Sequence, residues 1–391
     1  MGAANSTGHA LIEAIESQIV ELDPNFVTDA DRKTKGKTKP GYHPEIDLTD
    51  AGCSPDDLEF YYNEVSANSL KTKVVLAEAG VPFVYKHIEL THDGDFETKR
   101  APFLKINPSG TLPVLVYKGH PVYDSTAQVK FVAEMSPNGL YPPSQKELID
   151  KWVYAGSMEG FFMGEDAKEH IFDNLGTCFP WISIPMFIWD ESKRSHGDMA
   201  KILFDGRELA AANVLMRFFA MRIYEDATLS VGPKGFANPF VVNNVWANLR
   251  KGIEFHLGKM TEQLKASGGQ FLLGRSFTLA DASMIPFFQR ATITGWLDEL
   301  RGKFPVVERW WDACRNRPAY REWVPKYGGP NAPHMNPKEL AQFLKKMRQQ
   351  HPKFDAVYKG TYAEYEGPPP SSPNPCTAVV AKCMPVCVPK R

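Results

Sequence analysis

The chain has 391 residues, of which 43% are hydrophobic, so it is long enough for two or three domains with cores of their own. Its formal net charge at pH 7 is −1, and a nearly neutral chain does not attract nucleic acid through its overall field. Its six cysteines are too few for a disulfide framework at this length, and isolated thiols such as Cys178 and Cys314 are typical of a reducing compartment. No stretch approaches the roughly 20 apolar residues of a membrane span, and the N-terminal segment lacks a secretory signal. We therefore expect a cytoplasmic protein that binds no nucleic acid.

Residues 1–55 are expected to form an N-terminal extension with two features of membrane attachment. Gly2 follows the initiator Met and Ser6 lies four residues later, which fits the pattern for N-myristoylation. A basic cluster lies between Arg32 and Lys39, and it could supply the second attachment that a single acyl chain needs at a peripheral membrane. The alternatives are an unmodified leader and a solvated linker.

Residues 56–142 are expected to form the first domain, in the order strand, helix, strand, loop, hairpin, helix. Leu58–Tyr62 and Phe83–Leu90 are β-rich runs, and residues 69–79 between them are free of Gly and Pro until Gly80 ends a helix. Val114–Tyr117 and Pro121–Tyr123 flank a Gly-containing turn, as in a hairpin. Asp124 and Ser125 then open a helix that runs to about Met135.

Residues 143–330 are expected to be helical, with an insertion between Asp166 and Pro239. Aromatic residues gather around Phe179 to Trp189, and we interpret them as ordinary core packing or a dimer contact rather than a membrane-inserted segment. Asn243 to Lys265 is an amphipathic helix. Thr278 and Asp281 form a capping-box-like start to the next helix, whose apolar residues are expected in the core.

Residues 331–391 are expected to contain one helix and a disordered tail. Asn336 is an N-cap candidate followed by a Pro in the first turn, which predicts a helix start. The tail from Gly367 is rich in Pro and Ser. Its cysteines, Cys376, Cys383 and Cys387, have no zinc-site spacing and no nearby His, so no metal is expected; they are either unmodified or acylated.

Three local patterns together carry a resemblance to a known family. The first is Asn107-Pro-x-Gly-x-Leu-Pro-Val-Leu115, the second is Asp124-Ser125 after the hairpin, and the third is Phe271–Ala282 at a helix start. In this order and at this spacing they resemble the glutathione transferase superfamily, over about Leu58 to Trp323. The resemblance implies a thioredoxin-like α/β domain followed by an all-α domain. The insertion is similar to that of the ganglioside-induced differentiation-associated branch, but this chain shows no C-terminal membrane anchor of the kind that branch carries.

The resemblance also implies glutathione as co-substrate, with its thiol ionised by a hydroxyl donor near a helix N-terminus. Ser66 falls where zeta- and theta-like transferases carry their catalytic Ser, and Ser69 is the second candidate. Simple helix N-capping is the structural alternative for both. Asn68 falls where some bacterial relatives carry a Cys, so cysteine-dependent chemistry is not expected.

The remaining glutathione contacts follow from the same resemblance. Leu112-Pro113 is expected to be a cis peptide whose Leu112 main chain pairs with the cysteinyl part of glutathione. Asp124 would accept from the γ-glutamyl ammonium group, and Ser125 at a helix N-terminus would bind its carboxylate. Lys99 or Arg100 would reach the glycyl carboxylate.

Two functions of different class follow. One is a glutathione transferase-like enzyme that adds the thiolate to a small electrophile. Isomerase and reductive dehalogenase chemistry are variants of this function. A homodimer and a membrane tether are further expectations. The other is a non-catalytic scaffold that keeps the fold and binds partners through its surface.

Overall fold

The computed structural model describes residues 58–158, 174–186, 246–324 and 336–362, with internal gaps at 82, 89, 91–97, 99–102, 104–105, 108–109, 118–119, 137, 180 and 184–185. The N-terminal extension, the inserted segment between Asp166 and Pro239 and the cysteine-containing tail lie outside the described residues. Among the described residues, no helix is both long and apolar enough to cross a membrane.

The first domain contains a four-stranded mixed sheet in the order β2-β1-β3-β4. Its strands are β1 (Leu58–Tyr62), β2 (Val84–His87), β3 (Val114–Tyr117) and β4 (His120–Val122). β1 pairs in parallel with β2 and antiparallel with β3, and β3 pairs antiparallel with β4. The predicted strand–helix–strand unit and hairpin are therefore confirmed, and the domain is thioredoxin-like.

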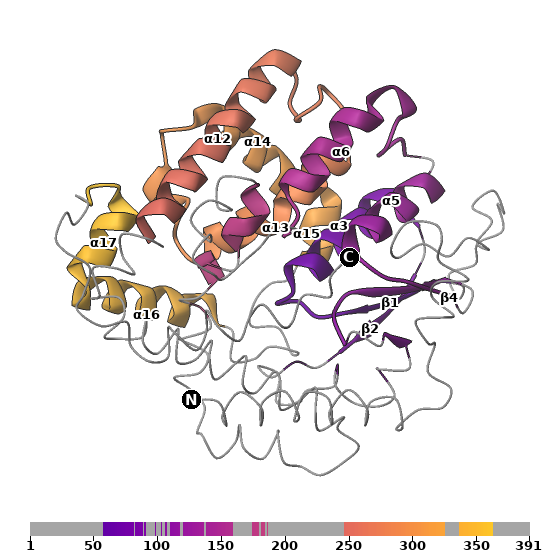
Figure 1. Ribbon diagram of the computed structural model, residues 1–391, viewed down its shortest axis with the longest axis horizontal. Helices are drawn as coiled ribbons and strands as arrows, with labels where there is room; N and C mark the ends of the chain where they lie inside the picture. The colour runs from indigo at the N-terminus through magenta and orange to yellow at the C-terminus, as the bar shows by residue number, and fades with distance from the viewer. Residues whose placement is uncertain are drawn as a thin grey trace, which may run out of the picture.

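Two helices, α3 (Ala67–Ala79) and α5 (Ser125–Met135), pack side by side against one face of this sheet (Figure 1). Successive side chains of a strand point to opposite faces, so Phe60 joins the core beneath these helices while Tyr61 joins a smaller cluster on the other face. Helix α3 begins at Ala67, two residues earlier than expected, because Ser66 rather than Ser69 is its N-cap.

The described part of the second domain is helical. Its elements are η4 (Pro143–Gln145), α6 (Lys146–Ala155), η5 (Leu175–Thr177), α12 (Asn248–Ser267), α13 (Leu279–Ile293), η8 (Asp298–Leu300), α14 (Pro305–Arg315), α15 (Pro318–Trp323), α16 (Pro337–Gln350) and α17 (Pro352–Lys359). Phe179, Ile182 and Met186 are buried in its core, which agrees with core packing for the described part of the aromatic segment.

Helix α13 is the central helix of this domain, and its start is fixed by Asp281. The Asp281 carboxylate accepts hydrogen bonds from the Thr278 amide at 3.0 Å, the Leu272 amide at 2.8 Å and the Trp310 indole at 2.8 Å. The expected capping box is therefore present, and the carboxylate also ties α13 to α14 and to the turn that contains Leu272.

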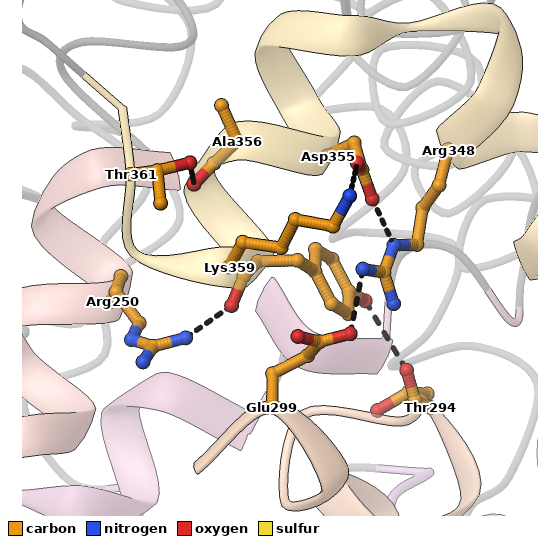
Figure 2. Close-up of polar contacts among 9 residues, drawn as sticks. Arg250, Thr294, Glu299, Arg348, Asp355, Ala356, Lys359 and Thr361 are labelled. Atoms are coloured by element: carbon orange, nitrogen blue, oxygen red, sulfur yellow. Dashed lines mark hydrogen bonds and ion pairs between the residues drawn. The ribbon is translucent and has the colours of Figure 1, made fainter.

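Helices α16 and α17 pack on the helical domain rather than extending from it. The Tyr358 ring stacks on Trp296 with centroids 4.0 Å apart, and its hydroxyl donates to the Thr294 carbonyl. Figure 2 shows Arg348 of α16 between Glu299 and Asp355, with N–O distances of 2.6 Å to each. The asparagine cap at Asn336 is confirmed, but α17 had not been expected from the sequence.

The two domains meet along α3, which packs against α13 and α15 (Figure 1). At the carboxyl end of α3, Glu78 accepts two hydrogen bonds of 2.5 Å from Arg317. The Arg317 guanidinium also lies over the rings of Phe271 and Phe277. The larger of the two hydrophobic clusters extends across both domains, from Leu58 in β1 to Tyr358 in α17.

Candidate glutathione site

Three segments of the first domain form the candidate site: the loop between β1 and α3, the loop before β3, and the start of α5. Two side-chain contacts hold α3 to α5 near their N-termini. Thr72 donates to the Gln128 amide oxygen at 3.1 Å, and the Lys71 ammonium donates to the Thr126 hydroxyl at 3.3 Å. The N-termini of both helices are thereby fixed on the same side of the sheet, which favours binding of anionic groups there.

Ser66 is the N-cap of α3, so the alternative of helix capping is confirmed for it. Its hydroxyl oxygen accepts from the Ser69 amide at 3.2 Å, and its side chain is partly exposed. A hydroxyl has one donor and two acceptor sites, so accepting this bond leaves its proton available for another acceptor. Capping and donation to a thiolate are therefore compatible at Ser66.

Ser69 was expected to be either the second candidate for the hydroxyl donor or a helix N-cap, and its position fits neither role. It is fully buried and does not cap the helix; its hydroxyl oxygen accepts from the Asn63 amide at 3.4 Å. The Asn63 side chain in turn accepts from the Val65 amide and donates to the Ile88 carbonyl. Ser69 thus helps to hold the loop that carries Ser66 and is screened from solvent.

The Leu112-Pro113 peptide bond is cis, as expected. The Pro113 carbonyl accepts from the Gln128 side chain at 2.9 Å, and the same amide group donates to the Val122 carbonyl at 2.8 Å. Gln128 is fully buried and joins the loop before β3 to β4, α5 and α3. The sequence did not single out this residue, because a polar residue within a helix gives no sign of which distant carbonyls it meets.

Asp124 is the N-cap of α5 and has a positive φ of 65°. One carboxylate oxygen accepts from the amides of Thr126 and Ala127 at 2.9 and 3.1 Å. Among the described residues, the other oxygen accepts no hydrogen bond, so it can face a ligand. Ser125, the first residue of α5, is 7% exposed.

Lys71 was not expected at this site. It is 2% exposed, and its ammonium group lies beside the N-terminus of α5 through its bond to Thr126. Its side chain therefore joins the first turns of α3 and the start of α5. By contrast Lys99, Arg100 and Gly2, which had been proposed as contacts or modification sites, lie outside the described residues.

A charged cluster supports the far side of the β1–α3 loop. The Glu64 carboxylate lies 3.0 Å from the His87 imidazole and 3.9 Å from the Lys73 ammonium. Burial opposes ionisation of Glu64, but the His87 hydrogen bond and the Lys73 charge together lower its pKa. Burial lowers the pKa of Lys73 in turn. Among the residues that the structure describes, no group of His, Cys, Asp or Glu side chains could hold a metal ion.

A small pocket separates the start of α3 from the helical domain. It is lined on the α3 side by Ala67, Asn68 and Lys71, and on the helical side by residues that include Met158, Phe179 and Phe287. Its volume of about 10 Å³ is room for about one water molecule, far below the roughly 300 Å³ of a usual small-molecule site.

Comparisons with known proteins identify both domains. The family described as "Glutathione S-transferase, N-terminal domain" matches residues 65–135, and "Glutathione S-transferase, C-terminal domain" matches residues 243–313. The chain is similar to glutathione S-transferase TCHQD of Arabidopsis thaliana, at 19% identity over 69% of this chain and 90% of that protein. It is also similar to glutathione S-transferase F9 of the same plant, at 23% identity over 69% of this chain and 97% of that protein.

A structure titled beta-etherase LigF from Sphingobium sp. strain SYK-6 aligns with a TM-score of 0.46 and 19% identity, over 68% of this chain and 98% of that chain. A glutathione transferase F2 from Populus trichocarpa aligns with a TM-score of 0.42 and 18% identity, over 68% and 97%.

Proposed function

Because the chain belongs to the glutathione transferase superfamily, we propose that it binds glutathione between α3, the Leu112-Pro113 loop and α5, and adds its thiolate to a small electrophile. The observation that carries this proposal is the N-cap position of Ser66, with a hydroxyl proton not committed to the cap. A free thiol has a pKa near ~8.5, so a donor at a helix N-terminus is needed to ionise much of it at pH 7.

The glutathione pose uses the remaining residues of the site. The open oxygen of Asp124 accepts from the γ-glutamyl ammonium group, and Ser125 with the N-terminus of α5 binds the γ-glutamyl carboxylate. The main chain of Leu112 pairs with the cysteinyl residue, which brings the sulfur towards Ser66. We add Lys71 to the site as a buried cation that favours the anionic ligand. Lys99 or Arg100 remains the proposed contact to the glycyl carboxylate.

Retention on immobilised glutathione, with elution by free glutathione, tests this proposal first. We expect retention at neutral pH, and turnover when a panel of electrophiles is supplied. A protein that binds no glutathione contradicts the pose outright. A protein that binds glutathione without turning over any electrophile supports the alternative function, a non-catalytic scaffold that keeps the fold and binds partners through its surface, its terminal extensions and the insertion in its helical domain.

Membrane tethering through an acylated Gly2 and the Arg32–Lys39 cluster is a separate proposal that rests on the sequence pattern. The Gly2→Ala variant removes the glycine whose amine would carry the acyl chain, and it leaves the folded domains unchanged. We expect it to move the protein from the membrane fraction to the soluble fraction. An intact mass without an added acyl chain, measured on protein from its native cell, contradicts this proposal.

A further inference from the structure

One side chain of the helical domain reaches into the loop that carries Ser66. Arg290 lies in α13, is 1% exposed, and donates from Nη2 to the Val65 carbonyl at 2.9 Å. The two residues are 225 positions apart in sequence, and Val65 directly precedes Ser66. The guanidinium group also lies over the Phe179 ring, 4.6 Å from its centroid.

The contacts of the loop show what this bond adds. The Val65 amide is held by the Asn63 side chain at 3.0 Å, and the Ser66 amide is held by the Asn63 carbonyl at 3.2 Å. These bonds come from within the first domain and fix the amide side of the turn. The Arg290 bond holds the carbonyl of the peptide unit between Val65 and Ser66, whose amide is already bonded to Asn63, so both polar groups of the peptide plane that leads into the serine have a partner.

We propose that Arg290 is a positioning residue through which the helical domain sets the placement of the Ser66 hydroxyl, and with it the ionisation of bound glutathione. This inference rests on the proposed role of Ser66. Arg290 suits the task because its planar guanidinium can donate along its edge to Val65 while its face packs on Phe179. A buried bond to a charged donor has little freedom to reorient, so the peptide plane is held more rigidly than by solvent-exposed contacts.

The chain offers a matched control for this contact. Arg317 is a second arginine that crosses the domain interface, but it binds Glu78 at the opposite end of α3, and its hydrogen bonds and ring contacts within the described part of the chain do not include the Val65–Ser66 turn. The Arg317→Met variant therefore weakens the interface without removing the contact to the loop. Arg290→Met removes the loop contact, and Arg290→Lys keeps a donor but loses the planar stacking on Phe179.

Amide hydrogen exchange on the full chain, without glutathione, is the first measurement. We expect the amides of residues 65 and 66 to exchange about tenfold faster in Arg290→Met than in the unchanged protein, a difference of about 1.4 kcal/mol in local opening. Measured relative to the amides of β1, which report any general loosening of the first domain, Arg317→Met should leave the exchange at residues 65 and 66 unchanged, and Arg290→Lys should lie between. Equal acceleration in both methionine variants, or none in Arg290→Met, overturns the proposal. If Arg290→Met does not fold, the exchange of the same two amides is compared between Arg290→Lys and Arg317→Met instead.

The second measurement is the pKa of bound glutathione, followed by the ultraviolet absorbance of its thiolate. We expect a rise of about one unit in Arg290→Met, which is about tenfold less thiolate at neutral pH, with little change in glutathione affinity. An unchanged thiol pKa overturns the proposal, because a merely structural role would lower stability alone. If the unchanged protein binds no glutathione, the proposed function fails, and the exchange measurement still decides the role of Arg290 in the loop.

Discussion

Asp124 combines two tasks that a single substitution can separate. Its backbone has a positive φ of 65°, and its carboxylate caps two amides of α5, so the residue is needed for the local fold. Asn has the same shape, tolerates positive φ and caps helices about as well as Asp. Only the negative charge towards the ligand differs between the two.

We therefore expect Asp124→Asn to weaken glutathione binding about tenfold to a hundredfold, the effect of losing one charge-assisted hydrogen bond of roughly 1.5–3 kcal/mol. The free energy of unfolding should change by less than about 0.5 kcal/mol, because the cap persists. Calorimetric titration with glutathione and urea denaturation measure the two effects. A large loss of stability with unchanged affinity would show that Asp124 serves the fold alone.

Ser66 and Ser69 can be distinguished in the same way. Ser66→Ala should raise the pKa of the bound thiol by about one to two units, since one bond to the charged form is worth roughly 1.5–3 kcal/mol. Conjugation at pH 7 should fall at least about tenfold and recover as the pH is raised. The lost cap should also destabilise the protein by about 1 kcal/mol. Rates measured from neutral to alkaline pH check this.

Ser69→Ala is the control for Ser66→Ala. Because Ser69 is buried and accepts from Asn63, its loss should lower stability by about 1 kcal/mol and leave the thiol pKa nearly unchanged. If Ser69→Ala abolishes conjugation while Ser66→Ala keeps it, the catalytic hydroxyl has been misassigned.

The sequence singled out those residues of the candidate site that lie in short local patterns, and did not single out those whose contacts are distant in sequence. Ser66 and Asp124 precede helices, and the cis bond at Leu112-Pro113 lies in a family-like loop, so local residue types identify them. Gln128, Lys71 and Arg290 lie inside helices, where polar residues are usually solvated. Only the packing of α3 against α5 and α13 shows what their side chains reach.

At the scale of single elements, the predicted helix starts agree with the observed ones where the N-cap residue was identified from the sequence. Thr278 and Asn336 were placed correctly as helix starts. The start of α3 was placed two residues late, because Asn68 and Ser69 could also have been caps. Helix α17 was missed although Pro352 in its first turn and the positive-φ Gly360 at its end mark both boundaries. Its eight residues lack the length that periodicity needs.

Asp281 allows a test of how strongly one cap supports its element. In Asp281→Asn the amide nitrogen cannot accept, so either the amide and hydroxyl of Thr278, which donate to one oxygen, or the Leu272 amide and Trp310 indole, which donate to the other, lose their partner. We expect a loss of about 2–5 kcal/mol at pH 7, because each unsatisfied buried donor costs roughly 1–3 kcal/mol. Urea denaturation measures it, with Thr278→Ser as a control that keeps the cap hydroxyl.

The stability difference between the unchanged protein and Asp281→Asn should depend on pH, because only the unchanged protein has a titrating group at this position. Burial raises the pKa of Asp281 to about 6, above its ordinary value of 3.8, despite the donors that lower it. A raised pKa means that the folded protein binds the proton more tightly, so this stabilisation is full at low pH and is lost as the pH rises through about 6. The stability difference from Asp281→Asn should therefore widen by about 1 kcal/mol between pH 7 and pH 5. A difference that narrows would contradict this assignment.

At the scale of the whole molecule, the two domains share one core. The buried cluster passes from the sheet through α3 and α13 to α17 without interruption, and two arginines, the buried Arg290 and the partly exposed Arg317, cross the interface at opposite ends of α3. The sequence predicted two domains and their order. It could not predict that residues 336–362, expected as an extension, pack on the helical domain, because this depends on a stack between Tyr358 and Trp296, which lie far apart in sequence.

This continuity predicts cooperative unfolding that depends on Arg317. All eight tryptophans follow residue 150, so tryptophan fluorescence reports on the helical domain, while hydrogen exchange in β1 reports on the sheet. In the unchanged protein the two probes should give the same urea midpoint, as for a single cooperative unit.

Arg317→Met leaves the Glu78 carboxylate, whose side chain is 6% exposed, without its bidentate partner and with an uncompensated charge at the interface. The Arg317 side chain is 30% exposed, so breaking the pair should cost less than the roughly 3–5 kcal/mol of a fully buried pair, and this cost falls on the contact between the domains. The sheet should then unfold at a lower urea concentration than the helical domain. Glu78→Gln in the same background removes the stranded charge and should bring the two midpoints closer together. Coincident midpoints in Arg317→Met would mean that the shared apolar core couples the domains without the ion pair.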